Sequence, residues 1–154
     1  MTAAQLLSEL ERTRDETLSY FDVPNDVLER RYAPGKWSVR YLLHHLSDSE
    51  SVMSYRLRRV ISEPRQVIWF YDQDAWAAAL DYSVVPLDLA RKMYEASRAS
   101  TIYYAERFYE ERGGTRFVHS VSGLRTLKDE FDKVADHNEH HLAQIRAAIN
   151  GGTS

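Results

Sequence analysis

Apolar side chains recur every three to four residues in four long segments of this chain, and that spacing is typical of amphipathic helices. Ser38 and Thr126 are good N-cap residues, and Pro86 suits the first position of a helix. Proline or glycine follows each segment and ends it. Four such helices predict an all-α fold, an antiparallel four-helix bundle. The predicted helices span residues 3–20, 38–61, 86–112 and 126–149.

The connection between the second and third predicted helices is unusually long and rich in aromatic residues. Residues 63–85 show no sustained hydrophobic period, and one or two helical turns are expected around Ala75–Leu80. Tyr71, Trp76 and Tyr82 lie in this connection, and such side chains favour a segment packed over the bundle. Long connections within a small domain are often functional. We therefore expect a decorated crossover between helices two and three.

Composition limits the classes of function that remain. At 154 residues the chain is expected to form a single domain over 1–154. It has no cysteine, which excludes disulfides, thiolate metal sites and a cysteine nucleophile. The net charge of −3 gives no general attraction to nucleic acid. The N-terminus lacks the apolar core of a signal peptide, and no apolar run is long enough for a membrane span, so we expect a cytoplasmic protein.

Six histidines are unevenly placed, and helical geometry separates them. At about 100° per residue, His141 lies about 50° and His137 about 90° from the centre of the last helix's apolar stripe, on one side. His140 points toward water. In the second helix, His45 flanks the apolar stripe, whereas His44 points nearly opposite to it. Three imidazoles, those of His45, His137 and His141, are therefore able to meet where the two flanks converge.

Three histidines on facing helices suit a divalent transition metal such as Zn, Ni or Fe. They leave a coordination position open, which is typical of a catalytic site. A histidine at the edge of the apolar stripe of a helix is often a hydrogen-bonded residue and not a metal ligand. An i, i+4 pair of histidines also occurs by chance. The zinc-protease motif HExxH is absent. The residues alone leave the metal site and the ordinary packing role evenly balanced.

The stretches around these histidines resemble the DinB-like superfamily, which includes the YfiT-like metal-dependent hydrolases. The likeness spans most of the chain, and the order and spacing of three segments carry it. These are Gly35–Arg40 with His45–Glu50, Asp72–Trp76 with Asp81 and Tyr82, and Asp136–Ile145. The resemblance implies a four-helix bundle with an unusual connection between helices two and three. It also implies a divalent metal on His45, His137 and His141. Relatives often have histidine at the position of loop residue His119, which we expect to support the site or the fold, with a role as fourth ligand less favoured.

The resemblance further implies chemistry on a small molecule. Some members transfer low-molecular-weight thiols to electrophiles, and others are described as hydrolases. A bound metal lowers the pKa of a thiol or of water, so both reactions suit an open site. Because the chain has no cysteine, a thiol must be a co-substrate. We expect thiol transfer slightly ahead of hydrolysis, in a homodimer.

Substrate-facing residues are less constrained by the sequence. Asp48 is a candidate base or a partner for an imidazole, although a solvated helix acid is equally consistent. Arg56 is a candidate for binding a carboxylate, but a surface salt bridge is the preferred interpretation. Trp76 and Tyr82 are candidates for a pocket roof, and core packing explains them equally well.

Two other classes of protein remain open. The first is a non-enzymatic, stress-associated bundle whose metal is structural. The second is a DNA-binding protein, suggested by a small basic cluster, but the acidic net charge and the absence of a recognition motif make nucleic acid the weakest partner. The cluster comprises Arg56, Arg58, Arg59 and Arg65.

Overall fold

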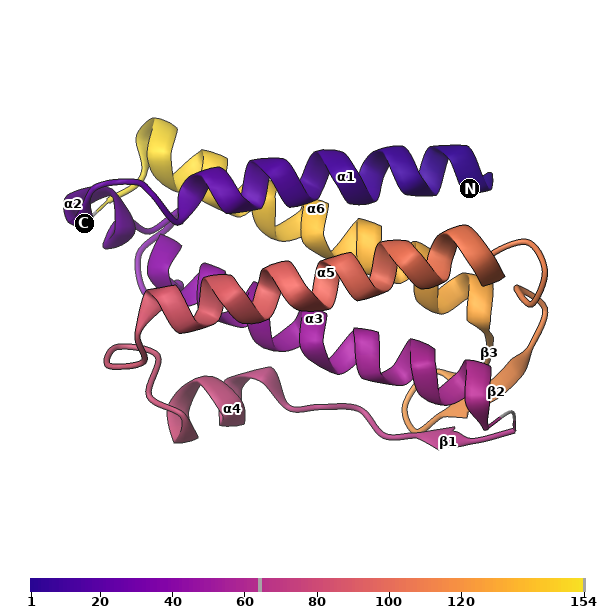
Figure 1. Cartoon of the computed structure of the whole chain (residues 1–154). Helices are drawn as coiled ribbons and strands as arrows, with labels where there is room; N and C mark the ends of the chain where they lie inside the picture. Colours follow the sequence, from indigo (N-terminus) through magenta and orange to yellow (C-terminus); the bar gives the residue numbers. More distant parts are fainter. Residues whose placement is uncertain (64, 154) are drawn as a thin grey trace.

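Four long helices form the body of the molecule, and a crossover and a small sheet lie against them (Figure 1). The computed structural model describes residues 1–63 and 65–153. Pro64, expected to end the second long helix, lies outside the described residues. The helices are α1 (Ala3–Tyr20), α2 (Asn25–Leu28), α3 (Val39–Ser62), α4 (Gln73–Ala79), α5 (Leu87–Phe108) and α6 (Leu127–Gly151). The strands are β1 (Val67–Ile68), β2 (Arg116–His119) and β3 (Gly123–Thr126).

The bundle has two long helices in each direction. α1 and α6 run one way, and α3 and α5 run the other way (Figure 1). α3 and α5 are parallel because the segment between them, with β1 and α4, returns along the length of α3 before α5 begins. The predicted four-helix bundle with a decorated crossover is confirmed. None of the described helices is both long enough and apolar enough to cross a bilayer.

Side-chain caps place the helix starts close to the predicted positions. Thr126 and Asp129 form a capping box at α6, and the Ser38 hydroxyl accepts from the backbone N–H of Tyr41 at α3. The predicted end of α5 near Arg112 was wrong, since the helix stops at Phe108. The next residue, Tyr109, is buried, and its hydroxyl donates to the Asp132 carboxylate at 2.6 Å. This hydrogen bond holds Tyr109 against α6, just before the chain enters β2.

A three-stranded sheet closes one end of the bundle, which the sequence did not predict. β1 pairs with β2 in parallel, and β2 pairs with β3 in antiparallel. His119 therefore ends a strand and is not a loop residue as expected; its Cα partners are Ile68 and Gly123. Strands of two to four residues are too short for an alternating pattern to be recognised. The sheet ties the crossover to the segment that precedes α6.

The core has two apolar clusters with a buried polar layer between them. One cluster includes Leu10, Met53 and Phe131, and the other includes Leu46 and Leu142. Between these positions, each long helix contributes buried polar side chains. They are Thr13 and Thr17 from α1, Glu50 from α3, Arg98 and Thr101 from α5, and Asn138 from α6.

Arg98 is the centre of that polar layer. Its guanidinium donates to both carboxylate oxygens of Glu50, at 2.9 and 2.7 Å, and to the Asn138 side-chain oxygen at 2.5 Å. Asn138 in turn donates to Thr17 at 2.9 Å and accepts from Tyr94 at 2.7 Å. Because Asn138 is held from α1 and α5, the network fixes the rotation of α6. The residue before Asn138 is His137.

The crossover packs against the face of α3 that lies opposite its apolar stripe. Helical periodicity alone predicts that this face is exposed to solvent. Tyr82 is 1% exposed, and its hydroxyl donates to the Asp48 carboxylate at 2.5 Å. Its ring stacks on His44, with centroids 5.2 Å apart. His44 is consequently 2% exposed, because the crossover packs against the face of α3 opposite the apolar stripe and buries His44 there. Burial, with Arg40 nearby, lowers the pKa of His44 to about 4.

Candidate metal centre

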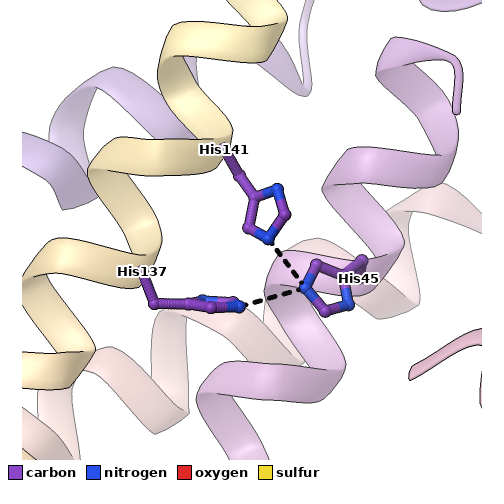
Figure 2. Close-up of side chains that lie close together, drawn as sticks. All are labelled: His45, His137 and His141. Atoms are coloured by element: carbon purple, nitrogen blue, oxygen red, sulfur yellow. Dashed lines mark hydrogen bonds between the residues drawn. The ribbon is translucent and has the colours of Figure 1, made fainter. Parts of the chain in front are cut away.

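The imidazoles of His45, His137 and His141 meet between α3 and α6. The Nε2 atom of His45 lies 3.2 Å from that of His137 and 3.0 Å from that of His141. One ring nitrogen from each of the three lies within 4.8 Å of the others. Figure 2 shows His45 projecting from α3 toward the two α6 histidines. The structure thus brings together the three residues that the sequence singled out.

Burial keeps these imidazoles neutral. Desolvation, followed by the proximity of His141, lowers the pKa of His45 to about 3. Desolvation and the other two imidazoles lower the pKa of His137 to about 2. The pKa of His141 is also lowered, mainly by burial. A neutral imidazole keeps a lone pair on one ring nitrogen, which is the form that binds a metal.

Hydrogen bonds on the far side of two rings fix their orientation. His141 Nδ1 lies 2.8 Å from the side-chain oxygen of Gln144, so this nitrogen carries the proton and Nε2 keeps its lone pair. His45 Nδ1 lies 3.1 Å from the Tyr71 hydroxyl. Such partners orient histidine ligands in metal sites. Trp37 also packs against His45, with ring centroids 5.2 Å apart.

The donor set fits a divalent transition metal. Tetrahedral coordination with metal–nitrogen distances of about 2.0–2.1 Å places the nitrogens about 3.3 Å apart, close to the separations of His45 from its two neighbours. His141 directs its Nε2 lone pair at His45 Nε2, which also lies beside His137 Nε2, so one N–H of His45 at most is shared between two acceptors. Nδ1 of His137 has no hydrogen-bond partner among the described residues. A cation between the Nε2 atoms would accept the lone pairs.

Two cavities open beside the cluster, one against each α6 histidine. The His141 cavity has a volume of about 330 Å³ and is lined by polar residues that include Tyr32, Lys36 and Gln73. The His137 cavity has a volume of about 180 Å³ and includes Arg56 and Gln73. A larger apolar groove of about 430 Å³ includes none of the three histidines in its lining. The cluster is therefore accessible from two sides that share Gln73.

Three other predicted site residues, Asp48, Tyr82 and Trp76, do not belong to the histidine cluster. Asp48 is held by Tyr82, and His45 Nδ1 is hydrogen bonded to Tyr71, so Asp48 does not orient that imidazole. Tyr82 joins the crossover to α3 and lines none of the cavities described above. Trp76 lines the apolar groove and packs edge-on against Tyr71 at 4.8 Å.

Arg56 is buried, which contradicts the surface salt bridge preferred from the sequence. It is 5% exposed, and its Nη2 donates to the Trp69 carbonyl at 2.6 Å. The crossover covers Arg56 through the segment that contains Trp69. A buried Arg56 also contributes nothing to an exposed basic cluster for DNA.

Two further residues near the cluster, Gln144 and Lys133, were not predicted as functional candidates. Gln144 follows His141 by three positions, and helical spacing places these side chains on one face, so this signal was present. Lys133 precedes His137 by four positions and lines the His137 cavity. Nothing in the sequence distinguished Lys133 from a solvated lysine.

Replacing Gln144 by alanine is expected to weaken metal binding about 10–100-fold, because His141 loses the acceptor that fixes its tautomer. Competition with a chromogenic chelator measures this affinity. Gln144→Glu, which retains an acceptor oxygen, is the matched control and should stay closer to the wild type. Equal affinity of Gln144→Ala and the wild type would show that Gln144 does not orient the ring.

The fold and the histidine cluster define a four-helix-bundle protein whose imidazoles are arranged to hold a metal. The model of the DinB superfamily matches residues 9–145, and the chain belongs to that superfamily. The family resemblance seen in the sequence is thereby confirmed.

Curated relatives and a solved structure agree with this assignment. A protein of Oceanobacillus iheyensis, named "Putative metal-dependent hydrolase OB0413", is 30% identical over 84% of this chain and 74% of its own length. A second protein of that organism with the same description, OB0782, is 32% identical over 80% of this chain and 72% of its own. The structure of YfiT from Bacillus subtilis, described as a probable metal-dependent hydrolase with an unusual four-helix bundle topology, superposes with a TM-score of 0.84. That match has 22% identity and covers 94% of this chain and 83% of YfiT, and it supports the fold.

Proposed function

We propose that this protein is a metal-dependent enzyme whose His45, His137 and His141 hold one divalent transition-metal ion for nucleophilic attack on a small electrophile. The observation that carries the proposal is the convergence of three neutral imidazoles, two of them buried and that of His137 partly buried, beside two cavities. A divalent metal with an open position lowers the pKa of bound water or thiol and supplies a nucleophile near neutral pH.

The residues of the chain prepare the site for that chemistry. Burial keeps His45 and His137 unprotonated over the physiological pH range. Gln144 and Tyr71 hold two of the rings in place. The three imidazoles contribute no net charge, so the ion's full positive charge is available to a nucleophile or to a developing anion.

Hydrolysis is the leading reaction, since the relatives reported above are named as metal-dependent hydrolases. Thiol transfer is a second candidate, and one observation favours it. The two cavities approach the cluster from the sides of His141 and His137, an arrangement that suits two separate substrates. The thiol would come from solution, since the chain has no cysteine.

Protein purified without a metal-affinity tag is expected to contain about one equivalent of Zn, Ni or Fe by elemental analysis. Returning that metal to chelator-treated protein at 100 times its Kd should stabilise the fold by about 2.7 kcal/mol. For a chain of this size, the melting temperature should rise by roughly 5–10 °C. Failure to take up a stoichiometric metal, even after addition, would refute the proposal.

Activity assays on the loaded protein separate the two reactions. Hydrolysis predicts turnover of ester or amide substrates without added thiol. Thiol transfer predicts consumption of an electrophile only when a low-molecular-weight thiol is present. A loaded protein inactive in both screens would favour the non-enzymatic bundle with a structural metal.

A further inference from the structure

The cavity beside His137 combines two cationic side chains and two imidazoles with apolar walls that include Met53 and Phe70. It lies between α3, the crossover, the end of β2 and α6. Arg56, His119 and Lys133 line it together with His137. No Asp or Glu is among the described residues that line it.

Arg56 lines both this cavity and the apolar groove, and several of its N–H groups are not used in hydrogen bonds within the described part of the chain. Of its five N–H groups, the one hydrogen bond found among the described residues is that from Nη2 to the Trp69 carbonyl. Nη1 lies 3.7 Å from a Glu130 oxygen, which is an ion pair but too long for a hydrogen bond. Glu130 therefore balances the charge of Arg56 without occupying its donors.

His119 contributes a neutral donor. The backbone N–H groups of Val121 and Ser122 donate to its Nδ1 at 3.2 and 3.3 Å. Because Nδ1 accepts these bonds, the ring proton lies on Nε2. His119 is 7% exposed, and its place at the end of β2 is fixed by the sheet.

Lys133 supplies the uncompensated charge. It is half-buried one helical turn before His137, and no ion pair to it is found among the described residues. With Glu130 balancing Arg56 and with His119 neutral, this ammonium leaves the cavity with a net positive charge. Carboxylate and phosphate groups are the natural ligands of such a combination of guanidinium, ammonium and imidazole N–H.

We infer that the His137 cavity binds a carboxylate or phosphate group of the substrate, and that the substrate is a small anion. The volume of about 180 Å³ is equivalent to roughly six water molecules at about 30 Å³ each, enough for one anionic group on a short stem. His137 lines this cavity and belongs to the metal cluster, so an anion here places the adjoining part of the substrate at the metal. The inference rests on the proposed function for its meaning in catalysis.

Anion binding to metal-free protein tests this inference separately from catalysis. Acetate and inorganic phosphate are titrated into chelator-treated, dialysed wild-type protein at constant ionic strength in chloride, with NMR shifts as the readout. We expect saturable shifts in His119 and Lys133 signals, and the tighter of the two anions identifies the preferred group. Absence of saturable binding by either anion would overturn the inference.

Charge-matched variants locate the site. Lys133→Met should weaken binding about tenfold or more, because a charge-assisted hydrogen bond is lost, and Lys133→Arg should restore most of it. Lys92→Met removes the same unit of charge from an exposed residue on α5 that does not line the cavity, and should stay within about twofold. Equal weakening in Lys92→Met and Lys133→Met would overturn the inference, since only net charge would then matter.

The two proposals fail in distinguishable ways. Stoichiometric metal without anion binding in the metal-free protein refutes the anion site and leaves the proposed function standing. Anion binding in a protein that never takes up metal confirms the cavity's selectivity and refutes the metal-dependent reaction.

Discussion

His141→Ala protein is expected to contain less than about one tenth of an equivalent of metal when it is purified beside a wild type that holds one. His141 supplies one of three nitrogens, and the two that remain give a much weaker site. Metal-dependent activity should fall below detection, and added metal should no longer raise the melting temperature. Elemental analysis and thermal unfolding measure these effects, and His45→Ala should reproduce them from the opposite helix.

His140→Ala is the matched control for metal content. It removes an imidazole from the adjacent position of α6, where the side chain is exposed and does not belong to the cluster. This variant should keep about one equivalent of metal. Retention of metal by His141→Ala, or loss of metal in His140→Ala, would mean that the ion binds elsewhere or adventitiously.

The second large effect is expected from Arg98→Met, which should lower the free energy of unfolding by about 3–5 kcal/mol. Arg98 is fully buried, and the variant leaves the Glu50 carboxylate without its main partner in the middle of the bundle. Asn138 also loses a donor, so the rotation of α6 is less well fixed. Urea unfolding of metal-free protein measures the loss.

Two comparisons identify the origin of that loss. Arg98→Met combined with Glu50→Leu removes both charges, and it should recover a substantial part of the stability. Arg14→Met removes a partly exposed arginine paired with Asp15, and it should cost less than about 1 kcal/mol. If Arg98→Met were as mild as Arg14→Met, the buried network would not be what holds the four helices in register.

The sequence determined the four long helices and the three histidines of the cluster. Local physics is sufficient for both, because caps such as Thr126 act within one turn and the spacing of His137 and His141 is set by one helix. Periodicity also placed His45 on the flank of the apolar stripe of its own helix, and the family resemblance implied the same three ligands. These features depend on contacts between residues close in the chain or on a pattern shared by relatives.

The tertiary structure alone decided how the crossover lies. Periodicity in α3 treats the helix as having one buried face, but residues 65–86 return along the helix, bury His44 and Asp48 on the opposite face and cover Arg56 on the flank. The short strands are likewise stabilised by pairing between distant segments, with β1 and β2 about fifty residues apart in the chain. The hydrophobic periodicity of the sequence predicts which side chains share one face of a helix. Long-range packing decides which helix faces are covered. It also brings Arg56 and Lys133 together beside His137, and no local pattern in the sequence predicts this.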